Sequence, residues 1–238
     1  MYDSMEKKLK IPIGKKFIYC TLNYQSPSDK LIILVHGLGG HQNEHIHYNA
    51  KNLFIQKGYA VLRFNLYSTE HDARKIEECS ISTNSADLAE VIGYFEKKFK
   101  AMYLIGHSLG GPVILHCKAT AKAKKIMLWD PSLNLKIIQK RYTFNKTMNL
   151  WQKVTSGIRF IGKEMHQELG ALDTKKQLAK ISTPLKIILA EKSMWAKQKH
   201  EIAALNIKVK IIPKADHNFD EEGVEEQLLK ETLDFLKS

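Results

Sequence analysis

Ser108 lies in the stretch with the clearest capacity for chemistry, a Gly-x-Ser-x-Gly pattern over 106–110. The apolar run over 101–105 and the apolar-periodic segment over 109–121 predict a buried strand, a sharp turn and a helix. Such a turn holds a serine in strained backbone geometry, so its hydroxyl stands exposed as a nucleophile requires. The flanking glycines are needed because side chains there would collide with the neighbouring strand and helix.

Further polar groups follow other predicted strands. The loop at 36–37, Asp130, Glu191 and His217 each lie at or just past the end of an apolar run. Reactive groups of open parallel sheets collect beyond the carboxyl ends of the strands, so we expect these groups near Ser108. A serine hydroxyl needs a base within hydrogen-bond reach before it can attack, and a histidine can supply one.

Alternating strands and helices position these groups. Strand and helix patterns joined by short connections predict an α/β fold with a mostly parallel sheet covered on both faces. An antiparallel hairpin is expected first, at 8–13 and 16–24. The expected strands are 31–35, 59–64, 101–105, 124–129, 184–190 and 207–212. The expected helices are 44–57, a helix that begins at 85–87, 109–121, 196–205 and 221–236.

The alternation stops between 133 and 181. Apolar residues there recur at helical spacing and predict one or two amphipathic helices: Trp151, Val154, Ile158, Ile161, Met165 and Leu169. We interpret 133–181 as an inserted helical cap, and 1–132 with 182–238 as the α/β core. An ordinary peripheral helical layer is the alternative interpretation of the same segment.

The composition is that of a soluble globular protein, with 44% hydrophobic and 26% charged residues among 238. The net charge of +12 comes mainly from lysines spread along the whole chain. A lysine-rich solvated surface is the simplest interpretation, and an anionic substrate, an acidic carrier or an anionic membrane surface are the alternatives. Because there is no dense basic tail or aromatic-interleaved patch, we expect no nucleic-acid partner.

The three widely spaced cysteines offer neither a disulfide framework nor metal-binding spacing, which indicates a reducing compartment. The first 14 residues lack the long apolar core of a signal peptide, and no window approaches the ~18 apolar residues of a membrane span. We therefore expect a cytoplasmic protein without stable membrane insertion. The sequence leaves its oligomeric state open.

With the serine turn, the His-Gly-x-Gly loop over 36–39 and the late His217, the chain resembles the α/β-hydrolase superfamily essentially from end to end. The stretches 58–64, 181–184 and 215–219 are also similar to patterns of that family. Within the superfamily the chain looks most like small serine esterases and lysophospholipase-type lipases with a helical cap.

The resemblance implies roles for particular residues. Ser108 matches the nucleophile and His217 the base, while the backbone N–H groups of Leu38 and Leu109 match the oxyanion hole. The histidines that flank these motifs, His36 and His107, are expected to be structural.

The acid of the triad departs from the family pattern, which places an aspartate shortly after the strand that follows the cap. The equivalent position here is Ser193, which cannot stabilise an imidazolium as a carboxylate does. Asp130 preserves the chain order Ser…Asp…His and is favoured. Glu191 is the alternative acid, and Asp216 is poorly placed to face the ring of its neighbour His217.

His41, His45 and His47 invite a metal interpretation, because histidines at i and i+4 share a helix face. The pattern is not His-Glu-x-x-His, and no carboxylate spacing completes a site. We therefore expect cleft-rim or surface histidines, no metal and no cofactor.

The leading hypothesis is a serine hydrolase, EC 3.1, that cleaves carboxylic esters of small molecules through an acyl-enzyme. Apolar residues of the expected cap, such as Trp151, Ile158 and Phe160, suggest an acyl or aromatic group in the substrate. An acyl thioesterase is one alternative. The other is a catalytically impaired binding protein on the same scaffold, motivated by Ser193 at the usual acid position. Ser108 argues against a dehalogenase, because the nucleophile of a dehalogenase at that position is a carboxylate.

Overall fold

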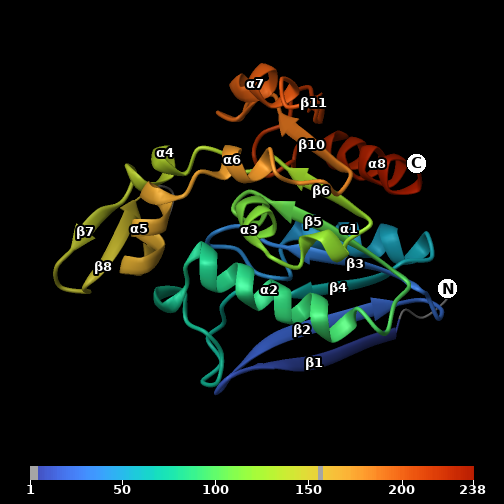
Figure 1. The fold of residues 1–238 in the computed structure, drawn as a ribbon, viewed down its shortest axis with the longest axis horizontal. Helices are drawn as coiled ribbons and strands as arrows, with labels where there is room; N and C mark the ends of the chain where they lie inside the picture. Colours follow the sequence, from blue (N-terminus) through green and yellow to red (C-terminus); the bar gives the residue numbers. More distant parts are fainter. Residues whose placement is uncertain (1–4, 155–157) are drawn as a thin grey trace.

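A central sheet of eight strands organises the protein (Figure 1). The computed structural model describes residues 5–154 and 158–238. β1 and β2 form the predicted antiparallel hairpin, β2 pairs antiparallel with β4, and the remaining neighbours are parallel. In sheet order the strands are β1 (Met5–Ile13), β2 (Lys16–Tyr24), β4 (Ala60–Phe64), β3 (Lys30–Val35), β5 (Ala101–His107), β6 (Lys125–Trp129), β10 (Leu185–Ala190) and β11 (Lys208–Ile212).

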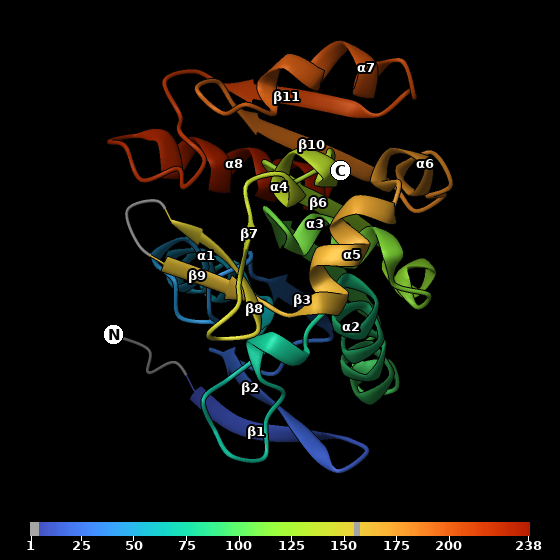
Figure 2. The ribbon, with the colours of Figure 1, turned by 90° about the vertical axis from the view of Figure 1, so that its left-hand side faces the viewer.

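Helices cover both faces of this sheet (Figures 1 and 2). α1 (His45–Gln56) and α8 (Val224–Lys237) pack on one face, and α2 (Ile81–Phe95) and α3 (Gly110–His116) on the other. The strand β3 shows why both faces need helices. Leu31 and Ile33 belong to one core cluster, while Ile32 and Leu34 belong to the cluster on the opposite side. Successive strand residues point to opposite faces, so a wholly apolar strand must be covered twice.

Two helix boundaries differ from the sequence-based expectation for local reasons. α2 begins at Ile81, before the expected start, because the Ser80 hydroxyl accepts from the Thr83 N–H at 3.1 Å and caps the helix there. α3 ends at His116, well before 121. The Thr120 hydroxyl bonds the carbonyl of Cys117 at 2.7 Å and supports a short 3-10 turn, η2 (Thr120–Lys122).

Short helical elements also occur elsewhere in the chain. The helix expected over 196–205 is divided into a 3-10 turn, η3 (Ala196–Gln198), and α7 (Lys199–Ala203). A further 3-10 turn, η1 (Ile76–Glu78), lies in the long polar connection before α2. Among the residues that the structure describes, no helix is both long and apolar enough to span a bilayer.

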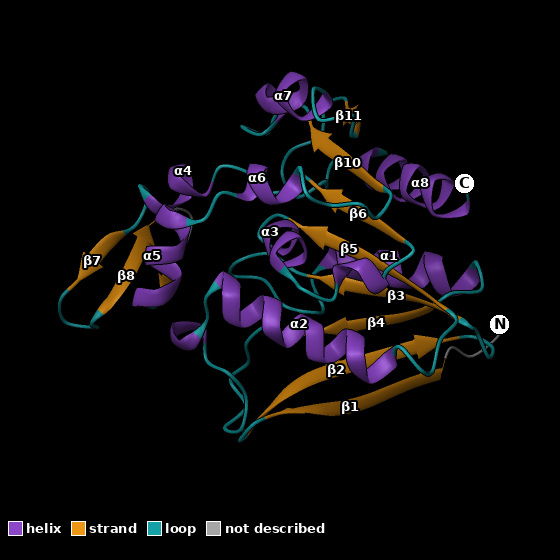
Figure 3. Cartoon of the chain, viewed as in Figure 1, coloured by secondary structure: helices purple, strands orange, loops and turns teal. Residues whose placement is uncertain are grey.

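Residues 133–181 are only partly helical. They contain α4 (Leu135–Gln139), α5 (Lys163–Ala171) and α6 (Thr174–Leu178), but also an antiparallel sheet of β7 (Thr143–Asn145), β8 (Leu150–Val154) and β9 (Ile158–Ile161). The prediction of a helix through 151–161 was therefore wrong. Trp151 and Ile161 are instead cross-strand partners in the antiparallel pair of β8 and β9. Such a pair places both side chains on one face of the sheet, as a helix would place them on one face of the helix. Figure 3 shows β7 and β8 projecting beyond the main sheet.

Candidate active site

Ser108 occupies the strained turn that the sequence predicts. It joins β5 to α3 with a φ of 54°, a left-handed conformation that is unusual for a residue with a side chain. The Ser108 N–H donates to the carbonyl of Trp129 at 3.0 Å, which ties the turn to the end of β6. The turn is also crowded: a Cβ on Gly110 would lie 2.2 Å from the Val35 carbonyl oxygen. Only glycine fits there.

We expect Gly110→Ala to destabilise the fold by about 2 kcal/mol or more, because the turn cannot move away from β3 without disturbing the sheet. Gly93→Ala is the matched control, since Gly93 lies inside α2 with nothing within 4 Å of its added Cβ. That change should stabilise by about 0.5–1 kcal/mol through helix propensity. Urea unfolding of both variants measures the difference, and equal stabilities would contradict the steric argument.

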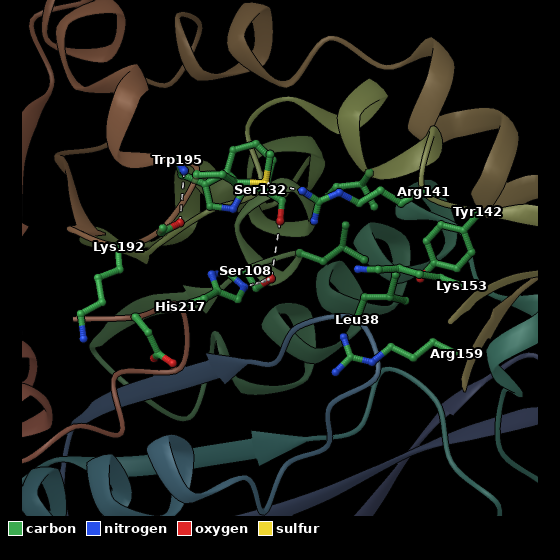
Figure 4. A pocket seen from close by; sticks show the side chains of 15 residues that line it. Leu38, Ser108, Ser132, Arg141, Tyr142, Lys153, Arg159, Lys192, Trp195 and His217 are labelled. Atoms are coloured by element: carbon green, nitrogen blue, oxygen red, sulfur yellow. Dashed lines mark hydrogen bonds between the residues drawn. The ribbon is translucent and has the colours of Figure 1, made fainter. Parts of the chain in front are cut away.

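His217 lies between β11 and α8, and its ring points toward Ser108 in the pocket (Figure 4). On its other side the ring contacts Asp130. Its Nε2 is 2.8 Å from the Ser108 Oγ, and its Nδ1 is 2.5 Å from Asp130 Oδ2. Asp130, just after β6, is fully buried, and its second oxygen accepts the Ala190 N–H at 3.1 Å. The serine, imidazole and carboxylate thus form one continuous hydrogen-bonded chain at the carboxyl edge of the sheet.

The other carboxylates face elsewhere. Glu191 is exposed and accepts the Lys214 N–H at 2.7 Å, so its carboxylate is engaged in the turn after β11. Asp216 accepts the Asn218 N–H at 2.8 Å and shapes the loop that carries His217. Of the two acids weighed from sequence, the structure brings Asp130 and not Glu191 into contact with the imidazole.

His107 holds the His217 loop from behind. Its ring is buried, and its Nε2 lies 2.8 Å from the carbonyl oxygen of His217. Burial lowers the pKa of His107 to about 3, so the imidazole is neutral and Nε2–H donates to that carbonyl. His107 therefore positions the imidazole of His217 through its backbone.

His36 fixes the loop opposite Ser108. It is buried, its Nε2 accepts the Leu66 N–H at 3.0 Å, and its Nδ1–H therefore donates to the Gly37 carbonyl at 2.8 Å. Burial lowers the pKa of His36 to about 4, which keeps this tautomer neutral. The Tyr67 hydroxyl accepts the Gly39 N–H at 2.6 Å. Sequence reasoning missed Tyr67, because it lies in a polar connection that carries no motif.

The two candidate oxyanion donors flank the serine. Leu38 and Leu109 line the same pocket as Ser108 and His217. Among the described residues, neither Leu38 N–H nor Leu109 N–H has a protein acceptor. The loop over 36–39 also approaches the turn at Ser108 closely, since a Cβ on Gly37 would lie 3.0 Å from the Cβ of Ser108. Both candidate donors thus belong to residues that line the pocket of Ser108.

The pocket above Ser108 has a volume of about 450 Å³. Apolar side chains line part of it: Leu38, Leu109, Ile138, Tyr142, Met194 and Trp195. Ser132 lies beside the nucleophile, its Oγ 3.5 Å from that of Ser108, and was not singled out from sequence. The rest of the lining is largely charged, with Arg141, Lys153, Arg159, Lys192 and Asp216.

The 133–181 segment was expected to provide apolar surface for the substrate, but the residues named for it do not include those that line the pocket. Trp151 stacks on His166 with ring centroids 3.4 Å apart, and neither Trp151 nor Phe160 lines the pocket. The side chain of Ile158 lies outside the described part of the structure. Ile138 and Tyr142 provide apolar surface instead, because α4 and the turn after it border the pocket.

The histidines of the 41–47 stretch do not converge on one point. His47 is buried against Trp129, contrary to the expectation of a rim or surface position, while His41 and His45 are exposed. Within the described ranges, the one group of three side chains spaced for a metal ion is carboxylate only: Asp216, Asp220 and Glu221. Exposed acidic groups are common without a metal, and Glu221 already pairs with a lysine.

Known proteins share this architecture. The family described as "Putative serine esterase (DUF676)" matches residues 25–139. The structure is similar to that of Est1E from Butyrivibrio proteoclasticus, solved with ferulic acid, at 18% identity over 97% of this chain and 100% of that chain, with a TM-score of 0.81. Mouse alpha/beta hydrolase domain-containing protein 10 is 15% identical over 97% of this chain and 98% of that chain, with a TM-score of 0.72. No protein of curated function matches the chain.

A third similar structure is the Pyrococcus furiosus esterase Pf2001, at 15% identity over 98% of this chain and 92% of that chain, with a TM-score of 0.72. At these identities the likeness establishes the fold: the protein is an α/β hydrolase in architecture, as the sequence predicts. The family match, which covers just under half of the chain, is to serine esterases and supports ester hydrolysis.

Proposed function

We propose that the protein is a serine esterase of class EC 3.1 that cleaves carboxylic esters of small molecules through an acyl-enzyme. The observation that carries the proposal is the hydrogen-bonded chain from Ser108 through His217 to Asp130. In the first step Ser108 Oγ attacks the ester carbonyl while His217 Nε2 takes the hydroxyl proton. The new oxyanion accepts hydrogen bonds from the Leu38 and Leu109 N–H groups.

The intermediate then collapses, and His217 returns the proton to the departing alcohol. The acyl group stays on Ser108 until a water molecule, activated by the same imidazole, releases the acid. Asp130 holds the Nδ1–H tautomer of His217 and stabilises the imidazolium that forms in each half-reaction. Its burial and its bond to the Ala190 N–H keep it in one orientation, so the imidazole is aimed before substrate binds.

The cap interpretation of 133–181 forms part of this proposal. The segment supplies Ile138, Arg141, Tyr142, Lys153 and Arg159 to the pocket, so it bounds the space above Ser108 that a substrate would fill. The α/β core of 1–132 and 182–238 supplies the reacting groups. A thioesterase would use the same groups, and parallel assays of thioester and oxygen-ester substrates separate the two activities.

The alternative of a catalytically impaired binding protein was based on Ser193 at the usual acid position. The contact of Asp130 with His217 supplies a carboxylate from another strand, so this reason for the alternative no longer applies. A fluorophosphonate probe tests the proposal, because it reacts only with an activated serine. We expect wild type to be labelled at Ser108 and to hydrolyse 4-nitrophenyl esters, and Ser108→Ala to lose both activities by more than about 10⁴-fold.

Ser132→Ala is the matched control, because it removes the neighbouring hydroxyl that does not contact His217 Nε2. Labelling should persist in that variant, with the adduct on Ser108 by mass spectrometry. If wild type were neither labelled nor active on any ester, the esterase proposal would fail. Labelling mapped to Ser132 would instead overturn the assignment of the nucleophile.

A further inference from the structure

One wall of the pocket is cationic. Arg141 follows α4, while Lys153 and Arg159 lie on β8 and β9, and all three line the pocket with Ser108. Figure 4 shows their side chains reaching from one side toward Ser108, with Lys192 on the other side of the serine. Three positive groups therefore border the space in which the substrate would be bound.

Two of these cations face each other directly. Lys153 and Arg159 are register partners in the antiparallel pair of β8 and β9, so their side chains leave the same face of the small sheet. Like charges in directly opposed positions destabilise a sheet. The pKa of Lys153 is lowered, first by partial burial and then by repulsion from Arg141 and Arg159. The arrangement costs stability in the free protein.

Ion pairing within the chain does not offset this cost. The other two arginines have partners at short distance: Arg74 binds Asp87 at 2.7 Å, and Arg63 donates to the Asn43 side chain at 2.7 Å. On the far wall Lys192 pairs with Glu221 at 2.8 Å. Among the described residues, none of the three cations of this wall forms an ion pair with a carboxylate, although Arg159 attracts the carboxylate of Glu44 from a greater distance and so acts to lower the pKa of that group.

The contacts that these side chains do make hold them at the pocket. Arg141 Nη2 lies 3.3 Å from the Met194 sulfur, on the opposite rim. Arg159 lies against the loop of Leu38, since a Cβ on Gly39 would be 3.1 Å from Arg159 Nε. The one acid of the lining, Asp216, is engaged with backbone N–H groups of its own loop. An anion entering the pocket would thus meet three cations without displacing an internal ion pair.

We propose that the substrate is an ester that carries a carboxylate or phosphate group, and that Arg141, Lys153 and Arg159 bind this anionic group while Ser108 attacks the ester carbonyl. This inference rests on the proposed esterase function and names its substrate class. A planar guanidinium binds carboxylate or phosphate oxygens in a bidentate fashion, and a partly buried ammonium adds a point charge. Binding the anion also relieves the repulsion between the three cations.

Matched pairs of esters test the inference. Mono-4-nitrophenyl glutarate carries a carboxylate at the end of its acyl chain, and 4-nitrophenyl pentanoate is its neutral counterpart of equal length. On the alcohol side, 4-acetoxyphenyl phosphate is compared with phenyl acetate. We expect wild type to prefer at least one anionic ester by tenfold or more in kcat/KM, with the preference falling as salt is added. The two arms distinguish an acyl-side carboxylate from an alcohol-side phosphate.

The triple variant replaces Arg141, Lys153 and Arg159 together by glutamine. It should lose the preference for anionic over neutral esters. Arg141→Gln, Lys153→Gln and Arg159→Gln should each lower the ratio of anionic to neutral kcat/KM by part of this preference, as expected for loss of one charge-assisted hydrogen bond of several. Lys146→Gln is the matched control, because Lys146 is an exposed lysine in the turn between β7 and β8 that does not line the pocket. It should leave the ratio unchanged.

The outcomes separate this inference from the esterase proposal. Ser108-dependent hydrolysis without preference for either anionic ester, or a preference retained in the triple variant, overturns the anion site and leaves the esterase standing. Calorimetric titration with glutarate and with phenyl phosphate reads anion binding without turnover. Binding by wild type that is lost in the triple variant supports the site even if no ester is cleaved. Equal binding by both proteins, or none by either, overturns it.

Discussion

Asp130→Asn is expected to lower kcat for ester hydrolysis by about 10⁴-fold while the protein stays folded. An asparagine can still accept the Ala190 N–H through its carbonyl oxygen, so the buried side chain keeps one of its two contacts. Its amide group would then face Nδ1 of His217 and donate where the carboxylate accepted. The imidazole is thereby held in the wrong tautomer, with its proton on the nitrogen that must deprotonate Ser108.

Glu191→Gln is the matched control. Glu191 is the other carboxylate that the sequence offers as a triad acid, and its oxygen accepts the Lys214 N–H rather than contacting His217. A glutamine can accept the same bond, so we expect kcat to change by less than about twofold. Steady-state kinetics of the two variants, with circular dichroism to verify folding, decides between the acids. Loss of activity in Glu191→Gln with Asp130→Asn still active would reverse the assignment.

The protein is expected to lose stability steeply as the pH falls from 6.5 to 5, because three buried histidines stay neutral in the folded state. Burial lowers the pKa of His36 to about 4 and that of His107 to about 3, and it lowers the pKa of His47 well below the ordinary value. In the unfolded chain a histidine binds its proton near pH 6.5. The stabilisation is therefore present above that pH and is lost as the pH falls toward the folded-state pKa.

Each of these histidines can remove up to about 1.4 kcal/mol of unfolding free energy per pH unit within that window. Glu44, which lies 3.6 Å from His47, acts with the opposite sign, since burial raises the pKa of its carboxyl and the folded state takes up that proton first. Urea unfolding at half-unit pH steps measures the net slope. His47→Leu should make the slope shallower by removing one titrating group, and a flat profile would contradict the account.

The sequence could single out the serine and the imidazole that we propose to react, because local patterns mark their positions. Ser108 lies in a glycine-flanked turn between an apolar strand and a helix, and His217 lies between the last strand and the last helix. The sequence favoured Asp130 over Glu191 from its position in the chain, but it could not show which carboxylate reaches the imidazole. The answer depends on which of two neighbouring parallel strands directs its terminal carboxylate toward His217, and that requires three-dimensional register.

The 133–181 segment shows a second limit. Trp151 and Ile161 have a spacing that suits one face of a helix and also suits opposed positions in two strands, so the pattern alone did not distinguish the structures. The cationic wall was hidden for a related reason. Lys153 and Arg159 are six residues apart in a lysine-rich chain, and only the pairing of β8 with β9 sets them opposite each other.

The position of Asp130 has a consequence for how such a chain can diverge. Asp130 directly follows β6, upstream of the 133–181 segment, and its second oxygen accepts the N–H of Ala190 at the end of β10. The three residues proposed to act in catalysis thus all follow strands of the main sheet, whereas the cationic wall belongs to the segment between β6 and β10. Under the proposed function, insertions, deletions or exchanges within 133–181 are therefore expected to change which substrates bind without altering the proposed chemistry of Ser108, His217 and Asp130.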